Sequence, residues 1–150
     1  MNDSIVIDKN ARRRLSEALR HLATGQTTNY KFEDRIGDKE MLRCKDRAIW
    51  AIRHQAWFLY SDTKEYRLRG KCTVSEKDRK VIARIQLFLR TRLEYEWPTH
   101  PGETIWGMIA NVLTLGLIGR LFWNRRWQRS GKYSIWPFIR EKDFRNAKRI

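Results

Sequence analysis

Apolar residues recur every three or four positions through much of the first hundred residues, which is the spacing of one face of an α-helix. This spacing predicts a helix over 8–23, where Asp8 or Asn10 can cap the start and Gly25 suits a left-handed turn after the end. Its apolar positions are Ala11, Leu15, Ala18, Leu19 and Leu22, and the charged residues that mostly take the other face are Arg12, Arg13, Arg14, Glu17 and Arg20.

A short second helix is expected after the Gly25–Thr28 turn. Thr28 or Asn29 can cap it, and Gly37 ends it. The residues expected to face inward are Tyr30, Phe32 and Ile36.

The next helical stretch covers 39–60, either as one helix or as a weak turn followed by a stronger start at Asp46. Its later part, AIWAIRHQAWFLY, is apolar almost all round. A helix without a polar face is typical of the centre of a core. The prediction therefore places Trp50, Trp57 and Phe58 in the core.

The clearest helical pattern starts at Ser75, whose pairing with Asp78 approximates a capping box. It is expected to run to Trp97–Pro98, since a proline disfavours helix in the residue before it. One apolar stripe follows its length, made of Val81, Ile82, Ile85, Phe88, Leu89 and Leu93. Ile85, Phe88 and Leu89 complete the predicted core.

These patterns together predict an all-α fold, a compact single-domain bundle of five to seven helices over 1–150. An N-terminal helical hairpin over 8–36 and an irregular C-terminal third, a basic aromatic segment over 120–150, are its expected subdivisions. No strand alternation is long enough to require a sheet.

The charge balance narrows the expected partners. The chain of 150 residues has 32 Lys and Arg against 17 Asp and Glu, a net charge of +15. Ten of the basic residues and only two of the acidic ones fall in 120–150. Such a field attracts nucleic acid, anionic lipid or acidic proteins, although solvated surface charges explain the same composition.

No pattern indicates catalysis, a cofactor, a metal site or a small-molecule substrate. His21, His54 and His100 have no metal-ligand spacing, and His54 is expected to be a hydrogen-bonded core residue. Glu94 and Glu96 form an acidic pair that is better explained as solvated or bonded to arginine. Cys44 has basic neighbours that can lower a thiol pKa, but such neighbours are nearly inevitable in this chain. We therefore expect a non-enzymatic protein.

Two further features bear on localisation. The apolar patch Ile5–Ile7 is too short for the core of a signal peptide, and the two cysteines suggest no disulfide framework, so a cytoplasmic protein is expected. The segment 105–123 contains fifteen residues without a charge, which is short for a membrane span. A buried helix, an interfacial membrane helix and a dimer interface all remain open for it.

Two resemblances add to this interpretation. Leu15, Leu19 and Leu22, followed by Gly25-Gln26-Thr27-Thr28 and Lys31-Phe32-Glu33, resemble in part the SHOCT module, a two-helix element of bacterial proteins. Thr27 and Lys31 stand where that pattern has an apolar residue and a glutamate. The resemblance implies self-association, hence a homo-oligomer. The stretches QAWFLYSD, LFLRTRLEYEWP and WPFI resemble parts of a family of small bacterial proteins of unknown function, which implies a bacterial source and no catalytic residue.

The C-terminal third supplies the predicted binding site. Trp123 and Trp127 share a helical face, as do Arg125 and Arg129, and Arg126 lies between them. Guanidinium groups that bind phosphates beside rings that stack on bases suit single-stranded nucleic acid or RNA. The predicted function is therefore binding of an anionic partner, nucleic acid first. Peripheral membrane association through 105–123 and self-association as a structural or adaptor protein are the alternatives.

Overall fold

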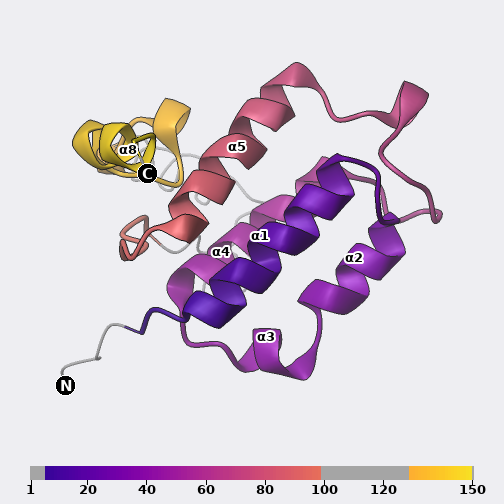
Figure 1. Ribbon diagram of the computed structural model, residues 1–150, viewed down its shortest axis with the longest axis horizontal. Coiled ribbons are helices and arrows are strands. Elements are labelled where there is room, and N and C mark those ends of the chain that lie inside the picture. The colour runs from indigo at the N-terminus through magenta and orange to yellow at the C-terminus, as the bar shows by residue number, and fades with distance from the viewer. Residues whose placement is uncertain (1–5, 99–128, 150) are drawn as a thin grey trace, which may run out of the picture. The chain divides into compact units, whose positions relative to one another are not determined.

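The computed structural model describes residues 6–98 and 129–149, and within them the fold is all-α, as predicted (Figure 1). The six α-helices of these residues are α1 (Lys9–Ala23), α2 (Asn29–Ile36), α3 (Lys39–Arg43), α4 (Arg47–Ala56), α5 (Glu76–Arg90) and α8 (Glu141–Ala147). Short 3₁₀ helices are η1 (Trp57–Leu59), η2 (Gly70–Cys72) and η5 (Tyr133–Ile135). In place of a sheet, one isolated antiparallel bridge joins Thr28 to Arg67.

Polar caps set the starts of the helices. In five of them a side chain before the first turn accepts a hydrogen bond from a backbone N–H within that turn, which satisfies a donor that has no partner inside the helix. The capping residues are Asp8, Thr28, Asp38, Asp46 and Ser75. Asp46 confirms the second alternative for 39–60, a short helix and then a stronger start.

The turn between α1 and α2 depends on a glycine. Gly25 has a φ of +65°, and a Cβ at this position would overlap the side chain of Arg69. The left-handed conformation and the close approach both require the absence of a side chain.

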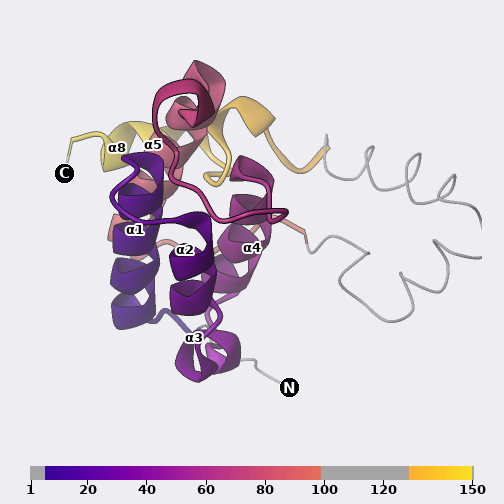
Figure 2. The ribbon, with the colours of Figure 1, turned by 90° about the vertical axis from the view of Figure 1, so that its right-hand side faces the viewer.

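Helix α1 is the centre of the first part of the molecule, and it contacts α2, α4 and α5 (Figures 1 and 2). Its stripe of Leu15, Leu19 and Leu22 is fully buried. Helix α5 turns Ile85, Phe88 and Leu89 inward, which confirms that half of the predicted core. These apolar contacts are the main favourable term in packing the helices.

One arginine of α1 contradicts the predicted polar face. Arg12 is only 1% exposed and Asp46 2%. The two form a paired contact, with Arg12 Nε 2.7 Å from Asp46 Oδ2 and Nη2 3.1 Å from Oδ1. Arg12 Nη1 donates to the carbonyl of Thr91 at 3.1 Å, and its guanidinium lies 5.3 Å from the ring centroid of Phe88. Full pairing is what allows a charge to be buried here.

The predicted aromatic core on α4 and η1 is wrong. Trp50 is 41% exposed, Trp57 52% and Phe58 74%. Helix α4 buries Ala48, Ile49, Ile52 and Ala56 instead, so its aliphatic side faces α1 and its rings face outward. Tyr30, expected to face inward from α2, is also exposed.

Helix α5 ends seven residues before the predicted stop at Trp97. The Thr91 hydroxyl donates to the Phe88 carbonyl at 2.7 Å and accepts from the Leu93 N–H at 3.2 Å. A threonine side chain thereby takes hydrogen bonds that a continuing helix would make.

The chain divides into two compact units, 1–95 with 147–150 and 96–146. In the described part of the second unit, the indole N–H of the buried Trp97 donates to the Phe138 carbonyl at 3.1 Å. The rings of Phe138 and Phe144 lie 5.3 Å apart, and Trp136 is buried. A single domain over 1–150 stays a prediction.

Candidate anion-binding groove

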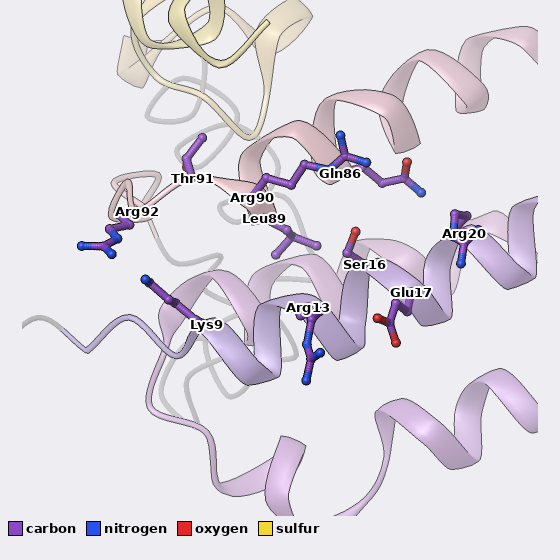
Figure 3. Close-up of a pocket in the computed structure, with 10 residues that line it drawn as sticks. All are labelled: Lys9, Arg13, Ser16, Glu17, Arg20, Gln86, Leu89, Arg90, Thr91 and Arg92. Atoms are coloured by element: carbon purple, nitrogen blue, oxygen red, sulfur yellow. The ribbon is translucent and has the colours of Figure 1, made fainter. Parts of the chain in front are cut away.

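A groove of about 430 Å³ lies between α1 and the end of α5 in the first unit (Figure 3). We call it the basic groove. Its ten lining residues are Lys9, Arg13, Ser16, Glu17, Arg20, Gln86, Leu89, Arg90, Thr91 and Arg92.

Basic side chains dominate the lining, with five cations and one carboxylate. Lys9, Arg13 and Arg20 fall on one face of α1, because steps of four and seven residues return close to the same side of a helix. Arg90 and Arg92 come from the end of α5 and the residues after it. Figure 3 shows Lys9 and Arg92 at one end of the basic groove and Arg20 toward the other.

These five cations lack acidic partners among the residues that the structure describes. No carboxylate oxygen of those residues lies within 4.0 Å of their side-chain nitrogens. Arg20 has a neutral neighbour in His21, whose Nε2 is 3.3 Å from Arg20 Nη2. By contrast, Arg14 on the same helix is bonded to both Asp38 and Glu40. With Glu17 as its one carboxylate, the lining keeps a formal excess of four positive charges, and none of its five cations is in an ion pair with a described carboxylate.

The other lining residues are mostly polar and carry no aromatic ring. Ser16, Gln86 and Thr91 offer neutral hydrogen-bonding groups, and Leu89 is buried between the helices. Such a surface can hold phosphate oxygens by charge and hydrogen bonds, but it provides no plane on which a base could stack.

The site predicted in the C-terminal third falls mainly outside the described residues. Trp123, Arg125, Arg126 and Trp127 belong to 99–128, and the proposed membrane segment 105–123 lies wholly within that range. Arg129 is described and exposed.

Sequence analysis missed the basic groove because its cations come from two distant stretches of the chain. The pattern on α1 was available, since Lys9, Arg13 and Arg20 share one face of the predicted helix. Nothing in the sequence showed that Arg90 and Arg92 would lie beside that face.

The other candidate groups lie in different surroundings. Burial raises the pKa of the Cys44 thiol above its ordinary 9.0, and the nearby carboxylates of Asp8 and Asp46 add to the rise despite the basic neighbours in sequence. Glu96 Oε2 is bonded to Arg140 Nη2 at 2.9 Å, as expected for an arginine-paired carboxylate. His54 is exposed beside Trp50 and is no core residue.

Within 6–98 and 129–149, no three His, Cys, Asp or Glu side chains gather as a metal site would require. In the same ranges no helix is both long and apolar enough to cross a membrane.

The chain matches no protein-family model, no curated protein and no solved structure. The resemblances to the SHOCT module and to the bacterial family stay predictions.

Proposed function

We propose that this protein binds nucleic acid through the basic groove, by contacts to phosphates and without catalysis. The observation that carries the proposal is the set of five exposed cations in one groove, none of them paired with a described carboxylate. Phosphate contacts supply most sequence-independent affinity for nucleic acid. We therefore expect binding with little preference for base sequence.

The arrangement of the cations favours a polymer over a single anion. From Lys9 to Arg20 the helix rises about 16 Å, at 1.5 Å per residue. Along one strand of a duplex this length contains about five phosphates, at 3.4 Å per nucleotide. A row of charges on this scale matches a chain of phosphates, whereas a free phosphate would need its ligands at one point.

Four of the five cations are arginines. A guanidinium group presents a planar fork of N–H donors that can bind two phosphate oxygens at once. Arginine also carries its charge throughout the physiological pH range. These properties support phosphate binding at the groove.

The lining favours nucleic acid over an anionic membrane. An interfacial helix needs apolar side chains that can enter the lipid beside its cations. The only aliphatic residue of the basic groove is Leu89, which is 5% exposed and packed in the core.

The test is fluorescence anisotropy of labelled single-stranded and duplex DNA and RNA, titrated with the full chain at several salt concentrations. We compare the wild type with the triple variant Arg13→Gln, Arg20→Gln, Arg90→Gln. A matched control removes three exposed lysines outside the groove, by Lys31→Gln, Lys71→Gln and Lys77→Gln. The groove variant should lose at least tenfold in affinity and show a shallower salt dependence, while the control changes affinity much less.

Three results would overturn the proposal. Equal losses in both triple variants would show attraction to net charge without a site. Loss only on Arg125→Gln, Arg126→Gln, Arg129→Gln would place binding at the site predicted from sequence. Vesicles of anionic lipid are the remaining arm, and stronger binding to them than to nucleic acid would assign the groove to a membrane surface.

A further inference from the structure

A second groove of about 530 Å³ lies in the first unit, lined by residues of α2, the α2–α3 turn, α3, α4 and η1. We call it the aromatic groove. The lining residues that matter here are Glu33, Ile36, Leu42, Trp50, Arg53 and Trp57.

Large apolar side chains gather in the aromatic groove although they are exposed to solvent. Leu42 is 59% exposed, and Trp50 and Trp57 are also exposed. Among the described residues seven large hydrophobic side chains are exposed, and these three line one groove. Scattered exposed apolar residues are normal, but apolar residues grouped in a concave site mark binding surfaces.

Two polar atoms in the lining are buried without a hydrogen-bond partner among the described residues. They are Nε of Arg53, a donor, and Oε1 of Glu33, an acceptor. Burial lowers the pKa of the Arg53 guanidinium, and the charge of Asp38 only partly offsets this effect. Buried polar atoms are nearly always hydrogen-bonded. Glu33 Oε1 lies near the hydroxyl of Tyr60, which is itself a buried donor. Of the two lining atoms, Arg53 Nε is therefore the one that points to a missing partner, which must offer an acceptor.

The charge around the aromatic groove restricts the partner further. The elements that line it, over 29–60, contain seven Lys and Arg and five Asp and Glu, a net charge of +2. Three of these acidic residues are bonded to arginines of α1, Asp46 to Arg12 and both Asp38 and Glu40 to Arg14. A second copy of this chain would bring the same positive surface against itself, whereas an acidic partner would be attracted.

We propose that the aromatic groove docks an acidic peptide segment of another protein. A large apolar side chain of that segment packs against Trp50, Trp57 and Leu42. A carboxylate or backbone carbonyl accepts the hydrogen bond from Arg53.

A peptide fits the lining better than the other anionic partners do. The walls combine indole rings with the aliphatic Ile36 and Leu42, which suits protein side chains as well as flat rings. Trp and Arg are the residues most enriched among binding hot spots of protein interfaces.

The first step of the test selects binders from a display library of random twelve-residue peptides. The immobilised bait is the full chain, and the library is first depleted on the double variant Trp50→Ala, Trp57→Ala, which has the same net charge. Leu42→Gln serves as a second depletion bait if the double variant fails to fold by circular dichroism. The expected peptides carry an aromatic or leucine side chain near Asp or Glu.

The second step measures the affinity of the best synthetic peptide by anisotropy. Trp57→Ala should weaken binding at least about 30-fold, the effect of removing one hot-spot side chain. Arg53→Gln should weaken it about tenfold and flatten its salt dependence. Phe58→Ala, an exposed ring on η1 that does not line the groove, and Lys77→Gln, an exposed charge on α5, should change the affinity less than about twofold.

Three outcomes would overturn the proposal. One is a library with no enrichment over the depletion bait, and another is a set of enriched peptides without acidic residues. The third is a peptide that binds the wild type and the tryptophan variants equally, which would show attraction to net charge alone.

Discussion

The basic groove and the aromatic groove belong to the same helical unit, yet their linings have almost nothing in common. The basic groove has five cations and no ring, while the aromatic groove has two tryptophans, a leucine and a single arginine. Helix α1 lines the first, and α4, which packs against α1, lines the second.

The difference shows how a strongly basic, tryptophan-rich chain can place its excess cations in one groove and its exposed tryptophans in another. The interpretation from sequence combined rings and arginines in one segment, as a site for stacking and charge together. In the described residues the two are separate, and each groove favours a different kind of contact. Excess positive charge in a polar groove favours phosphates, and exposed rings beside a buried donor favour a peptide.

The largest expected effect is on stability, and it should differ sharply between variants of two adjacent arginines of α1. Arg12→Ala should lower the free energy of unfolding by about 3–5 kcal/mol, because it leaves Asp46 buried without its partner. Arg13→Ala removes an exposed side chain of the basic groove and should change the free energy of unfolding by less than about 0.5 kcal/mol. Urea unfolding followed by circular dichroism measures both, and similar losses would contradict the structural assignment of Arg12.

A second contrast tests which side of α4 is the core. Ile49→Ala should cost about 2–5 kcal/mol in unfolding free energy, since it opens a cavity at a fully buried position. Trp50→Ala, one residue further on, should cost less than about 1 kcal/mol despite the larger side chain, because Trp50 is exposed. The same unfolding measurement decides, and a larger cost for Trp50→Ala would return this ring to the core.

A third prediction tests whether the two grooves act independently. Arg13→Gln should lower nucleic-acid affinity a few-fold and reduce the slope of log affinity against log salt by about 0.9, the effect of one lost phosphate contact. Trp57→Ala should leave both quantities unchanged, since its ring is outside the basic groove. Anisotropy over a range of salt concentrations measures them, and a large loss in Trp57→Ala would show one shared surface.

The smallest expected effect concerns Tyr60, whose hydroxyl is near Glu33 of the aromatic groove. Burial, and next the Glu33 carboxylate, raise the pKa of Tyr60 above its ordinary 10.0. The folded chain thus holds this proton more tightly than the unfolded chain. Its contribution to stability is complete below pH 10 and declines as the pH rises above it.

Unfolding measured between pH 8 and 11 should therefore show a steeper loss for the wild type than for Tyr60→Phe. Tyr30→Phe, at an exposed tyrosine of α2, is the control and should follow the wild type. Identical pH profiles for all three chains would rule out the raised pKa of Tyr60.

Much of the fold was predictable because its signals are local. Asp8, Thr28 and Ser75 start helices by bonding to a backbone N–H within three residues, and each was recognisable beside an apolar stripe. The stripe of α5 was equally clear. Its end was not, since Thr91 stops the helix through side-chain hydrogen bonds that the apolar pattern does not reveal.

The failures have a common physical reason, which is that they depend on distant contacts. Three consecutive arginines lie in the first two turns of α1, and only the position of Asp46, 34 residues further along from Arg12, decides that Arg12 is buried. In α4 the apolar residues surround the helix, so their period cannot tell the side that faces α1 from the side that faces water. The basic groove likewise required the placement of α5 beside α1.

The carboxylate of Asp46 has a consequence for the motions of the molecule. It accepts hydrogen bonds from the backbone N–H of Asp8 at 3.1 Å and of Ala48 at 3.0 Å, besides its contacts with Arg12. The first turns of α1 and α4 thus share one acceptor, and Arg12 links both to the carbonyl after α5. Fraying of one helix start withdraws hydrogen bonds from the other, so their amide protons should exchange with solvent as a single cooperative group.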